Sequence, residues 1–319
     1  IAEEDVVVTI SHAGFIKRFP VSGYRKQGRG GKGVTGAGTR EEDFIEHMFI
    51  ASTHHYIMFF TDRGKCYWLK VHEIPEGGRA TKGRSILNLI EKDKEENITA
   101  FVTVKEFTDD KFIVMATEKG TVKKTVLSAY SNIRRGGINA ISLAAGDRLI
   151  EAKLSEGKNE IIIGTRNGMA CRFNEKDVRN MGRTATGVRG IRLGKGDVVI
   201  GMIVIRNATT LMVVTEKGFG KRSEIEDYRL SRRGGKGVIT VKTSDRNGKL
   251  IAMKEVNDAD ELVIITTGGM VIRQAVKELR VMGRNTQGVR LIRLNEGDDI
   301  ADIARVIPEE ENGNGNGEE

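Results

Sequence analysis

The chain has 319 residues, 39% of them hydrophobic, and its 52 lysines and arginines outnumber 44 acidic residues to give a net charge of +8. This length fits two ordinary domains or one larger domain built from repeats, and no apolar run approaches the ~20 residues of a membrane span. Two distant cysteines argue against a disulfide framework. The first residue is Ile rather than Met and no signal peptide is visible, so we expect a fragment of a longer cytoplasmic polypeptide.

One unit occurs six times along the chain. An apolar run leads into Thr or Ser, two further residues and a glycine, as in VVVTISHAG, IMFFTDRG, IVMATEKG, IIIGTRNG, LMVVTEKG and LVIITTGG. Nineteen residues after each closing glycine a second signature ends, in GRGGKG, GRATKG, RRGGIN, GRTATG, RRGGKG and GRNTQG. The closing glycines are Gly14, Gly64, Gly120, Gly168, Gly218 and Gly269, and the second signatures end at Gly33, Gly83, Asn139, Gly187, Gly237 and Gly288. An interval held six times identifies a repeat.

Each unit predicts four short strands of one small sheet. The first is almost continuously apolar, as in residues 160–165, and should be buried on both faces. The closing glycine turns the chain into a second strand that alternates, as in 120–127, and should be half-exposed. A third strand follows the second signature, as in 188–193. After a Gly-Asp turn in three units, a fourth strand such as 198–205 completes the unit.

Six such units favour an all-β fold: a six-bladed, propeller-like ring of four-stranded antiparallel blades, since closure protects sheet edges that an open array would expose. WD40 and kelch rings are disfavoured because Trp68 is the only tryptophan. The alternative is two β domains of three units each. We expect one domain over 1–307, with blades at about 6–54, 55–110, 111–158, 159–208, 209–259 and 260–307, and an acidic, disordered tail at 308–319.

Positive charge is concentrated around the second signature. The 20 residues that follow each closing glycine hold 29 basic and 8 acidic side chains in total, whereas the other 199 residues hold 23 basic and 36 acidic ones. In a ring, one structural position would therefore be basic in every blade. Such a belt is typical of a surface that binds nucleic acid through its phosphates, with low sequence specificity and bending of the duplex.

Other kinds of site have little support. GRGGKG is not a P-loop, because Lys32 is followed by Gly33 and Val34 instead of a hydroxyl residue and a helix start. His54 and His55 lack nearby cysteine or acidic partners for a metal. We therefore expect no metal and no cofactor in this domain. The alternatives to DNA binding are a propeller that binds an acidic protein partner and, less favoured, an enzyme with its site in the central channel.

The first basic loop carries a family resemblance. QGRGGKG at 27–33 closely resembles the QRRGGKG box of the C-terminal domain of the DNA gyrase A subunit, which is a type IIA topoisomerase, with Gly28 where the family has Arg. The fifth unit has an echo, SRRGGKG, at 231–237. The resemblance covers essentially the whole chain. The related topoisomerase IV A subunit, whose similar domain lacks the intact box, is the nearest alternative.

The resemblance implies a β-pinwheel, a disc whose blades exchange strands and whose basic rim wraps double-stranded DNA in support of ATP-dependent negative supercoiling. It implies that this domain is not catalytic and that ATP and Mg²⁺ are used elsewhere in the holoenzyme. The implied partners are the N-terminal region of the gyrase A chain and the gyrase B chain, in an A2B2 assembly in the bacterial cytoplasm at the nucleoid. We expect no membrane association and a monomeric isolated domain.

The candidate DNA-binding residues follow from the charge pattern and the box together. They are Arg25, Lys26, Gln27, Arg29, Gly30, Gly31, Lys32 and Gly33 in the first unit and Lys82, Arg134, Arg135, Arg183, Arg232, Arg233, Lys236 and Arg284 in the others. Their expected role is electrostatic and positional. No catalytic and no metal-binding residue is expected.

Overall fold

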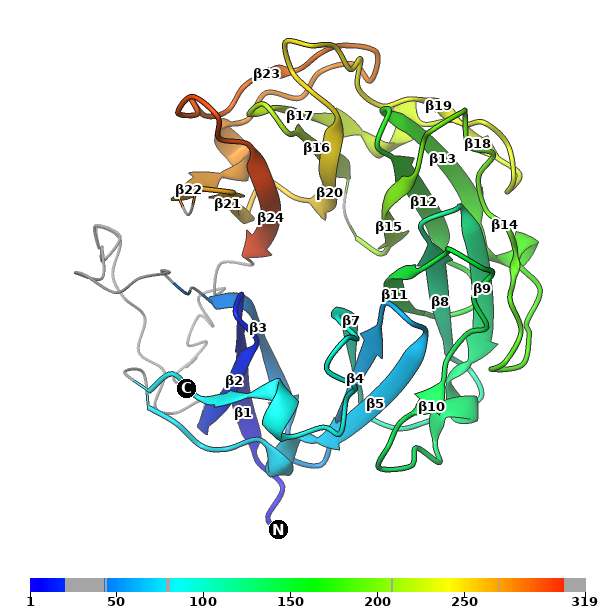
Figure 1. Cartoon of the computed structure of the whole chain (residues 1–319), viewed down its shortest axis with the longest axis vertical. Helices are drawn as coiled ribbons and strands as arrows, with labels where there is room; N and C mark the ends of the chain where they lie inside the picture. The colour runs from blue at the N-terminus through cyan, green and yellow to red at the C-terminus, as the bar shows by residue number, and fades with distance from the viewer. Residues whose placement is uncertain (21–42, 44, 79–80, 208, 269, 307–319) are drawn as a thin grey trace, which may run out of the picture.

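The chain forms a ring of small β-sheets (Figure 1). The computed structural model describes residues 1–20, 43, 45–78, 81–207, 209–268 and 270–306. Six sheets surround a central axis, and the inner strand of the last sheet contacts the inner strand of the first. The predicted all-β, six-bladed fold class is confirmed.

Three long strands recur in each unit. The apolar run forms β1 (Asp5–Ser11), β4 (Tyr56–Thr61), β8 (Phe112–Thr117), β12 (Glu160–Thr165), β16 (Thr210–Thr215) and β21 (Glu261–Thr266). The strand after the closing glycine forms β2 (Phe15–Pro20), β5 (Lys65–Lys70), β9 (Thr121–Val126), β13 (Met169–Asn174), β17 (Phe219–Glu224) and β22 (Val271–Ala275). The strands nearest the axis are β3 (Ile45–Ser52), β7 (Ile98–Val104), β11 (Leu149–Ser155), β15 (Val199–Ile205), β20 (Leu250–Val256) and β24 (Ile300–Val306) (Figure 1).

The predicted third strand differs from expectation in length and in place. Only two residues of each segment pair, as β6 (Arg84–Ser85), β10 (Ile138–Asn139), β14 (Val188–Arg189), β19 (Val238–Ile239) and β23 (Val289–Arg290). Each pairs with the second strand of the preceding unit, as β14 does with β9, so a unit and a blade are not the same segment of chain. The prediction that one unit makes one sheet is therefore wrong, and the strand exchange implied by the family resemblance is present.

Two sheets depart from four antiparallel strands. The fourth sheet gains a fifth strand, because β18 (Leu230–Ser231) adds to β13 in parallel. The sixth sheet has three described strands, β22, β21 and β24. The four remaining sheets have four strands each.

The glycine at the end of the second signature explains this exchange. Gly187 has φ +107°, and a Cβ there would lie 2.5 Å from the carbonyl oxygen of Val122 in β9. Gly237 has φ +76°, and a Cβ would lie 2.2 Å from the carbonyl oxygen of Ala170 in β13. Glycine is needed because the chain turns left-handed while it touches the neighbouring blade. The 19-residue interval is thus the length of chain that reaches from one blade to the next.

The hydrophobic core lies between neighbouring blades. One cluster joins Met58 and Phe60 of β4 to Ile113 and Met115 of β8, and four similar clusters join the other successive blades. The first strands are buried on both faces as predicted, Ile161 to Ile163 of β12 being fully buried. The predicted half-exposure of the second strands is wrong for β9, β13 and β17, because the loop and the 3-10 turn of the next unit cover them.

Polar turns complete each blade. The predicted Gly-Asp turns are present, with Gly146, Gly196 and Gly297 at positive φ. The aspartate that follows caps the neighbouring hairpin turn. The carboxylate of Asp147 accepts a hydrogen bond from the backbone amide of Lys119 at 3.0 Å, and that of Asp197 accepts one from the backbone amide of Asn167 at 3.0 Å. Short 3-10 turns lie at Val71–Glu73, Ile86–Asn88, Leu127–Tyr130, Glu175–Asp177, Ile225–Asp227 and Val276–Glu278. Many acidic residues outside the basic segments therefore serve turns.

Candidate nucleic-acid interface

The second-signature loops lie on the outer rim of the ring. In the second to sixth units, the loop leads directly into the short strand at the outer edge of a sheet, farthest from the axis (Figure 1). Five of the predicted cations are exposed on this surface, namely Lys82, Arg134, Arg135, Arg232 and Lys236. They come from the loops of the second, third and fifth units, so the rim presents exposed positive charge at several blades.

The box of the first unit cannot be placed in the same way. Its predicted residues Arg25, Lys26, Gln27, Arg29, Gly30, Gly31, Lys32 and Gly33 lie outside the described residues, as does the acidic tail. The exposed side chains of the other loops therefore define the candidate interface.

Three predicted arginines use part of their guanidinium to link neighbouring rim segments. Arg183 donates to the carbonyl of Asn139 at 2.7 Å, Arg233 to that of Arg189 at 3.0 Å, and Arg284 to that of Ile239 at 2.6 Å. Each acceptor is the last residue of the short outer strand of the preceding unit. These bonds fix one loop against the next, so the three arginines stabilise the rim as well as charging it.

Two other predicted cations have local partners. The Nε atom of Arg135 lies 2.9 Å from Oε1 of Glu91, and both side chains are largely exposed. Such an exposed ion pair contributes little to stability and opens readily to another anion. The Nζ atom of Lys82 lies 4.1 Å from the centre of the Phe15 ring.

The sequence counts overstated the accessible charge of the rim. Six cations of the basic segments are buried: Lys17, Lys123, Lys124, Arg172, Lys221 and Arg222. Several of them join a second strand to the 3-10 turn of the next unit through hydrogen bonds. Arg172 donates to the carbonyl of Tyr228 at 2.9 Å, and Lys124 donates to that of Glu175 at 3.1 Å. The sequence carries no local signal of this burial, because the groups that cover these cations belong to the next unit.

Three of the buried cations lie directly beneath rim loops. The side-chain nitrogen of Lys17 donates to the carbonyls of Gly78 at 2.9 Å and Thr81 at 2.8 Å. Lys123 donates to the carbonyl of Arg183 at 2.5 Å and to that of Ala140. Burial lowers the pKa of Lys123 to about 7, helped by the nearby positive charge of Arg183.

Lys221 is held in the same way under the loop of the sixth unit. Its nitrogen donates to the carbonyl of Gly283 at 2.9 Å, to the carbonyl and the hydroxyl of Thr286 at 3.1 and 2.9 Å, and to the carbonyl of Arg284. Burial lowers the pKa of Lys221 to about 8, again with a contribution from the charge of Arg284. Burial likewise lowers the pKa of Lys17.

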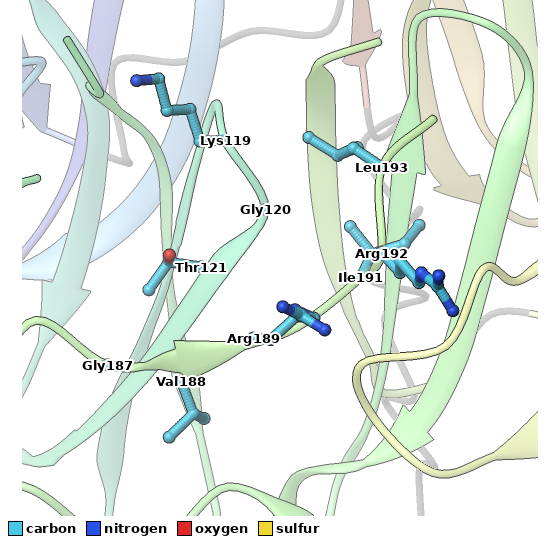
Figure 2. A pocket seen from close by; sticks show the side chains of 9 residues that line it. All are labelled: Lys119, Gly120, Thr121, Gly187, Val188, Arg189, Ile191, Arg192 and Leu193. Atoms are coloured by element: carbon cyan, nitrogen blue, oxygen red, sulfur yellow. The ribbon is translucent and has the colours of Figure 1, made fainter. Parts of the chain in front are cut away.

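The rim is hollowed beside the third and fourth units. A hollow of about 500 Å³ is lined by Lys119, by Arg189 of β14 and by Arg192 (Figure 2). Arg189 and Arg192 are exposed. Sequence reasoning missed both because it assigned them to a regular outer strand, yet the repeated VRGIR and VRLIR segments were a signal that more cations follow the second signature.

A larger hollow lies over β13, at the loop that echoes the box. It has a volume of about 700 Å³ and is lined by Arg229, Arg232 and Lys236, all exposed, together with the backbone of 234–237. The buried Cys171 also lines it. Exposed cations around a glycine backbone can bind phosphate oxygens through charge and through amide N–H groups.

The described residues offer little for chemistry. No group of three or more His, Cys, Asp and Glu in the described part of the chain could hold a metal ion. Cys66 and Cys171 are buried and free, and burial raises the pKa of each thiol, which keeps it protonated. In the same part of the chain, no helix has the length and apolar character that crossing a membrane requires.

Comparison with known proteins identifies the family. The model of the DNA gyrase C-terminal domain, beta-propeller, matches the chain at 5–52, 55–103, 111–155, 159–206, 209–257 and 260–307. The chain belongs to the DNA gyrase C-terminal domain family. It is 44% identical over 306 residues to the DNA gyrase A subunit of Escherichia coli and 44% identical over 309 residues to that of Staphylococcus aureus. Both alignments cover 96% of the chain and 35% of the relative, so the chain spans about a third of the length of these relatives.

Solved structures of the family share the ring. The C-terminal domain of DNA topoisomerase IV superposes with a TM-score of 0.82 at 25% identity, over 96% of this chain and 94% of that one. A DNA gyrase A C-terminal domain superposes with a TM-score of 0.75 at 25% identity, over 95% and 100%. The predicted resemblance to the gyrase A C-terminal domain is thereby confirmed, and the chain is homologous to a topoisomerase segment outside the catalytic region.

Proposed function

We propose that this chain is a DNA-binding module that wraps and bends duplex DNA around its outer rim, as part of a gyrase-type topoisomerase. The observation that supports it best is the recurrence of exposed cations in the second-signature loops of three units, at Lys82, Arg134, Arg135, Arg232 and Lys236. Duplex DNA carries about one negative charge per 1.7 Å, so a curved row of cations favours a bent duplex path. Binding through phosphates would be largely independent of sequence.

The module has no catalytic role in this proposal. ATP hydrolysis, Mg²⁺ use and strand cleavage belong to other parts of the holoenzyme, in which the partners are the gyrase B chain and the N-terminal region of the gyrase A chain. Its relatives are bacterial gyrase A proteins, which supports a place in the bacterial cytoplasm, at the nucleoid, in an A2B2 assembly. A monomeric isolated domain remains our expectation.

Titration against random-sequence duplex at several salt concentrations tests DNA binding. The logarithm of the binding constant should fall steeply with the logarithm of salt, by roughly 0.9 for each phosphate contacted. Lys236→Ala should lower this slope by about one. Lys195→Ala, which removes an exposed cation outside the second-signature loops, should leave the slope unchanged. A flat salt response of the unmodified chain would refute DNA binding and favour an acidic protein partner.

Wrapping is tested separately from binding. Fluorophores at the two ends of a long duplex should approach each other when the chain binds. The double variant Arg29→Ala, Lys32→Ala should reduce this approach more than it reduces affinity, because the box has a special role in the family. Equal losses would make the box one more patch of charge. Closed circular DNA relaxed in the presence of the chain should change its linking number if the wrap is gyrase-like, whereas a topoisomerase IV-like domain should change it little.

A further inference from the structure

One position of the second strand alternates between lysine and another residue from unit to unit around the ring. At the third position after the closing glycine, the first, third and fifth units have lysine, whereas the second, fourth and sixth have Tyr67, Cys171 and Ile272. The three lysines are Lys17, Lys123 and Lys221. Because the second strand of each unit lies under the loop of the next unit, the lysines lie under the loops of the second, fourth and sixth units.

The loops alternate in the same phase. Those above a lysine read GRATKG, GRTATG and GRNTQG, at 78–83, 182–187 and 283–288, whereas the loops of the third and fifth units read RRGGIN and RRGGKG. In two of the loops above a lysine, a threonine hydroxyl donates within the loop: Thr81 to the carbonyl of Gly78 at 2.8 Å, and Thr286 to the carbonyl of Gly283 at 3.1 Å. The same carbonyls accept from the lysine below. Each lysine of a second strand thus occurs together with one type of loop, although the two lie about 60 residues apart in the sequence.

The loops of the other class rest on a different support. Gly137 of RRGGIN packs on the ring of Tyr67, where a Cβ would lie 2.7 Å from the nearest ring carbon. RRGGKG lies over Cys171, whose sulfur is 3.9 Å from the carbonyl of Arg232. Each of these loops has two consecutive glycines, and a Cβ on Gly136 or Gly235 would meet open space. The other glycine of each pair faces the protein, Gly137 toward Tyr67 and Gly234 toward Arg189, so these loops are supported without a lysine.

The lysine beneath each of the loops at 78–83, 182–187 and 283–288 holds the loop in place while its own side chain stays buried. Lys123 and Lys221 are 0% and 1% exposed, so neither nitrogen can reach a phosphate. The carbonyls that they hold point inward, which keeps these acceptors away from the phosphate side of the loop. Hydrogen bonds from a charged or partly charged nitrogen are among the stronger ones in proteins, so the loop is held in one place before DNA arrives.

We propose that Lys17, Lys123 and Lys221 are positioning residues for duplex DNA: from beneath the rim they hold the loops of every second unit rigid. This inference rests on the proposed DNA-binding function. The rigid loops set where the duplex meets the ring, and the bend follows from their placement. Preorganised contacts also bind more tightly, because less conformational entropy is lost on association.

Lys123→Met is the informative variant, and Arg134→Met is its control. Methionine preserves the length and the apolar stem of Lys123 but removes every donor, whereas Arg134 is an exposed rim cation. In the free chain, Lys123→Met should speed amide hydrogen exchange in residues 182–187 by about ten- to a hundredfold, as expected when hydrogen bonds to a charged group are lost. It should reduce the approach of the duplex ends while leaving the salt slope unchanged. Arg134→Met should lower the slope by about one and leave exchange at 182–187 unchanged.

Three results would overturn the inference. Faster exchange at 182–187 with unaltered DNA bending would make Lys123 a purely structural residue, and a lowered salt slope would make it a phosphate contact. Because Lys123 is fully buried, Lys17→Met, which removes the bonds to the carbonyls of Gly78 and Thr81 in another blade, is the second test, with amide exchange measured at 81–83. If both variants unfold, the lysines are core stabilisers and the inference fails. If the unmodified chain binds no DNA, the proposed function fails instead, and the exchange results still report whether the lysines hold the loops.

Discussion

Replacing Glu175 by leucine should stabilise the domain. Glu175 begins the 3-10 turn of the fourth unit and is fully buried, and neither of its carboxylate oxygens has a hydrogen-bond partner among the described residues. The corresponding first residues of the other turns are Val71, Leu127, Ile225 and Val276, all buried. The fold therefore provides an apolar slot at this point of the second to sixth units, and the fourth unit fills it with a carboxylate.

The magnitude depends on what remains beside the slot. A buried polar group without a hydrogen-bond partner costs about 1–3 kcal/mol, and leucine removes that cost. Lys124 stays buried in the variant and loses the attraction of the carboxylate, but it keeps its bond to the backbone carbonyl of residue 175 and its place 5.0 Å from the centre of the Phe112 ring. We therefore expect the lower end, about 1 kcal/mol. At ~2.1 cal/mol/K of unfolding entropy per residue, a ring of this size should gain roughly 1.5 °C in Tm.

Urea unfolding followed by tryptophan fluorescence measures this change, with Trp68 as the intrinsic probe. Glu175→Gln should give a smaller gain, since the amide removes the charge and leaves an unsatisfied polar group. Lys176→Leu changes the exposed neighbour and should have little effect. A loss of stability in Glu175→Leu would refute the reasoning and show that the carboxylate has a stabilising partner.

Three further outcomes are expected. Gly237→Ala should destabilise the domain by about 1–3 kcal/mol, since the residue combines positive φ with a carbonyl 2.2 Å from the new Cβ, while Gly235→Ala, in open space, should not; urea midpoints compare the two. Between about pH 7 and 10, Lys123 is deprotonated in the folded chain and protonated in the unfolded chain, because burial lowers its pKa to about 7. The free energy of unfolding should therefore rise with pH by up to about 1.4 kcal/mol per pH unit, and Lys123→Met should lack this rise. Arg172→Met should cost about 3 kcal/mol in urea unfolding, because Arg172 is buried against two backbone carbonyls and Glu160.

Much of the fold was predictable from periodic features. The six closing glycines and the constant 19-residue interval identified the repeat, and buried runs such as residues 160–165 identified the strands. The Gly-Asp turns, including Gly196 and Asp197, were correct because a glycine at positive φ and a short carboxylate suit such a turn wherever it occurs. The exposure of cations such as Lys236 was also predictable, since a loop rich in glycine offers no core for them to enter, whereas their role in binding DNA stays a prediction.

The errors concern contacts between units. The segment at 188–193 was expected to complete its own sheet, but only Val188 and Arg189 pair, and they pair with the preceding unit. Periodicity gives the length and faces of a strand and carries no information on which distant strand it joins. For the same reason β9 was expected to be half-exposed, although a neighbouring unit covers it.

The sequence alone determined the number of units, the type of strand and turn in each, and the place of the basic signature within the repeat, because all of these follow from local patterns of apolar residues, glycines and charge. Only the tertiary structure decided which cations reach the solvent. Lys123 and Arg134 are eleven residues apart in one basic segment, yet Lys123 is sealed beneath a loop of the next unit and Arg134 is exposed on the rim. Exposure depends on what the neighbouring unit places above a side chain, and that contact exists only once the ring has formed.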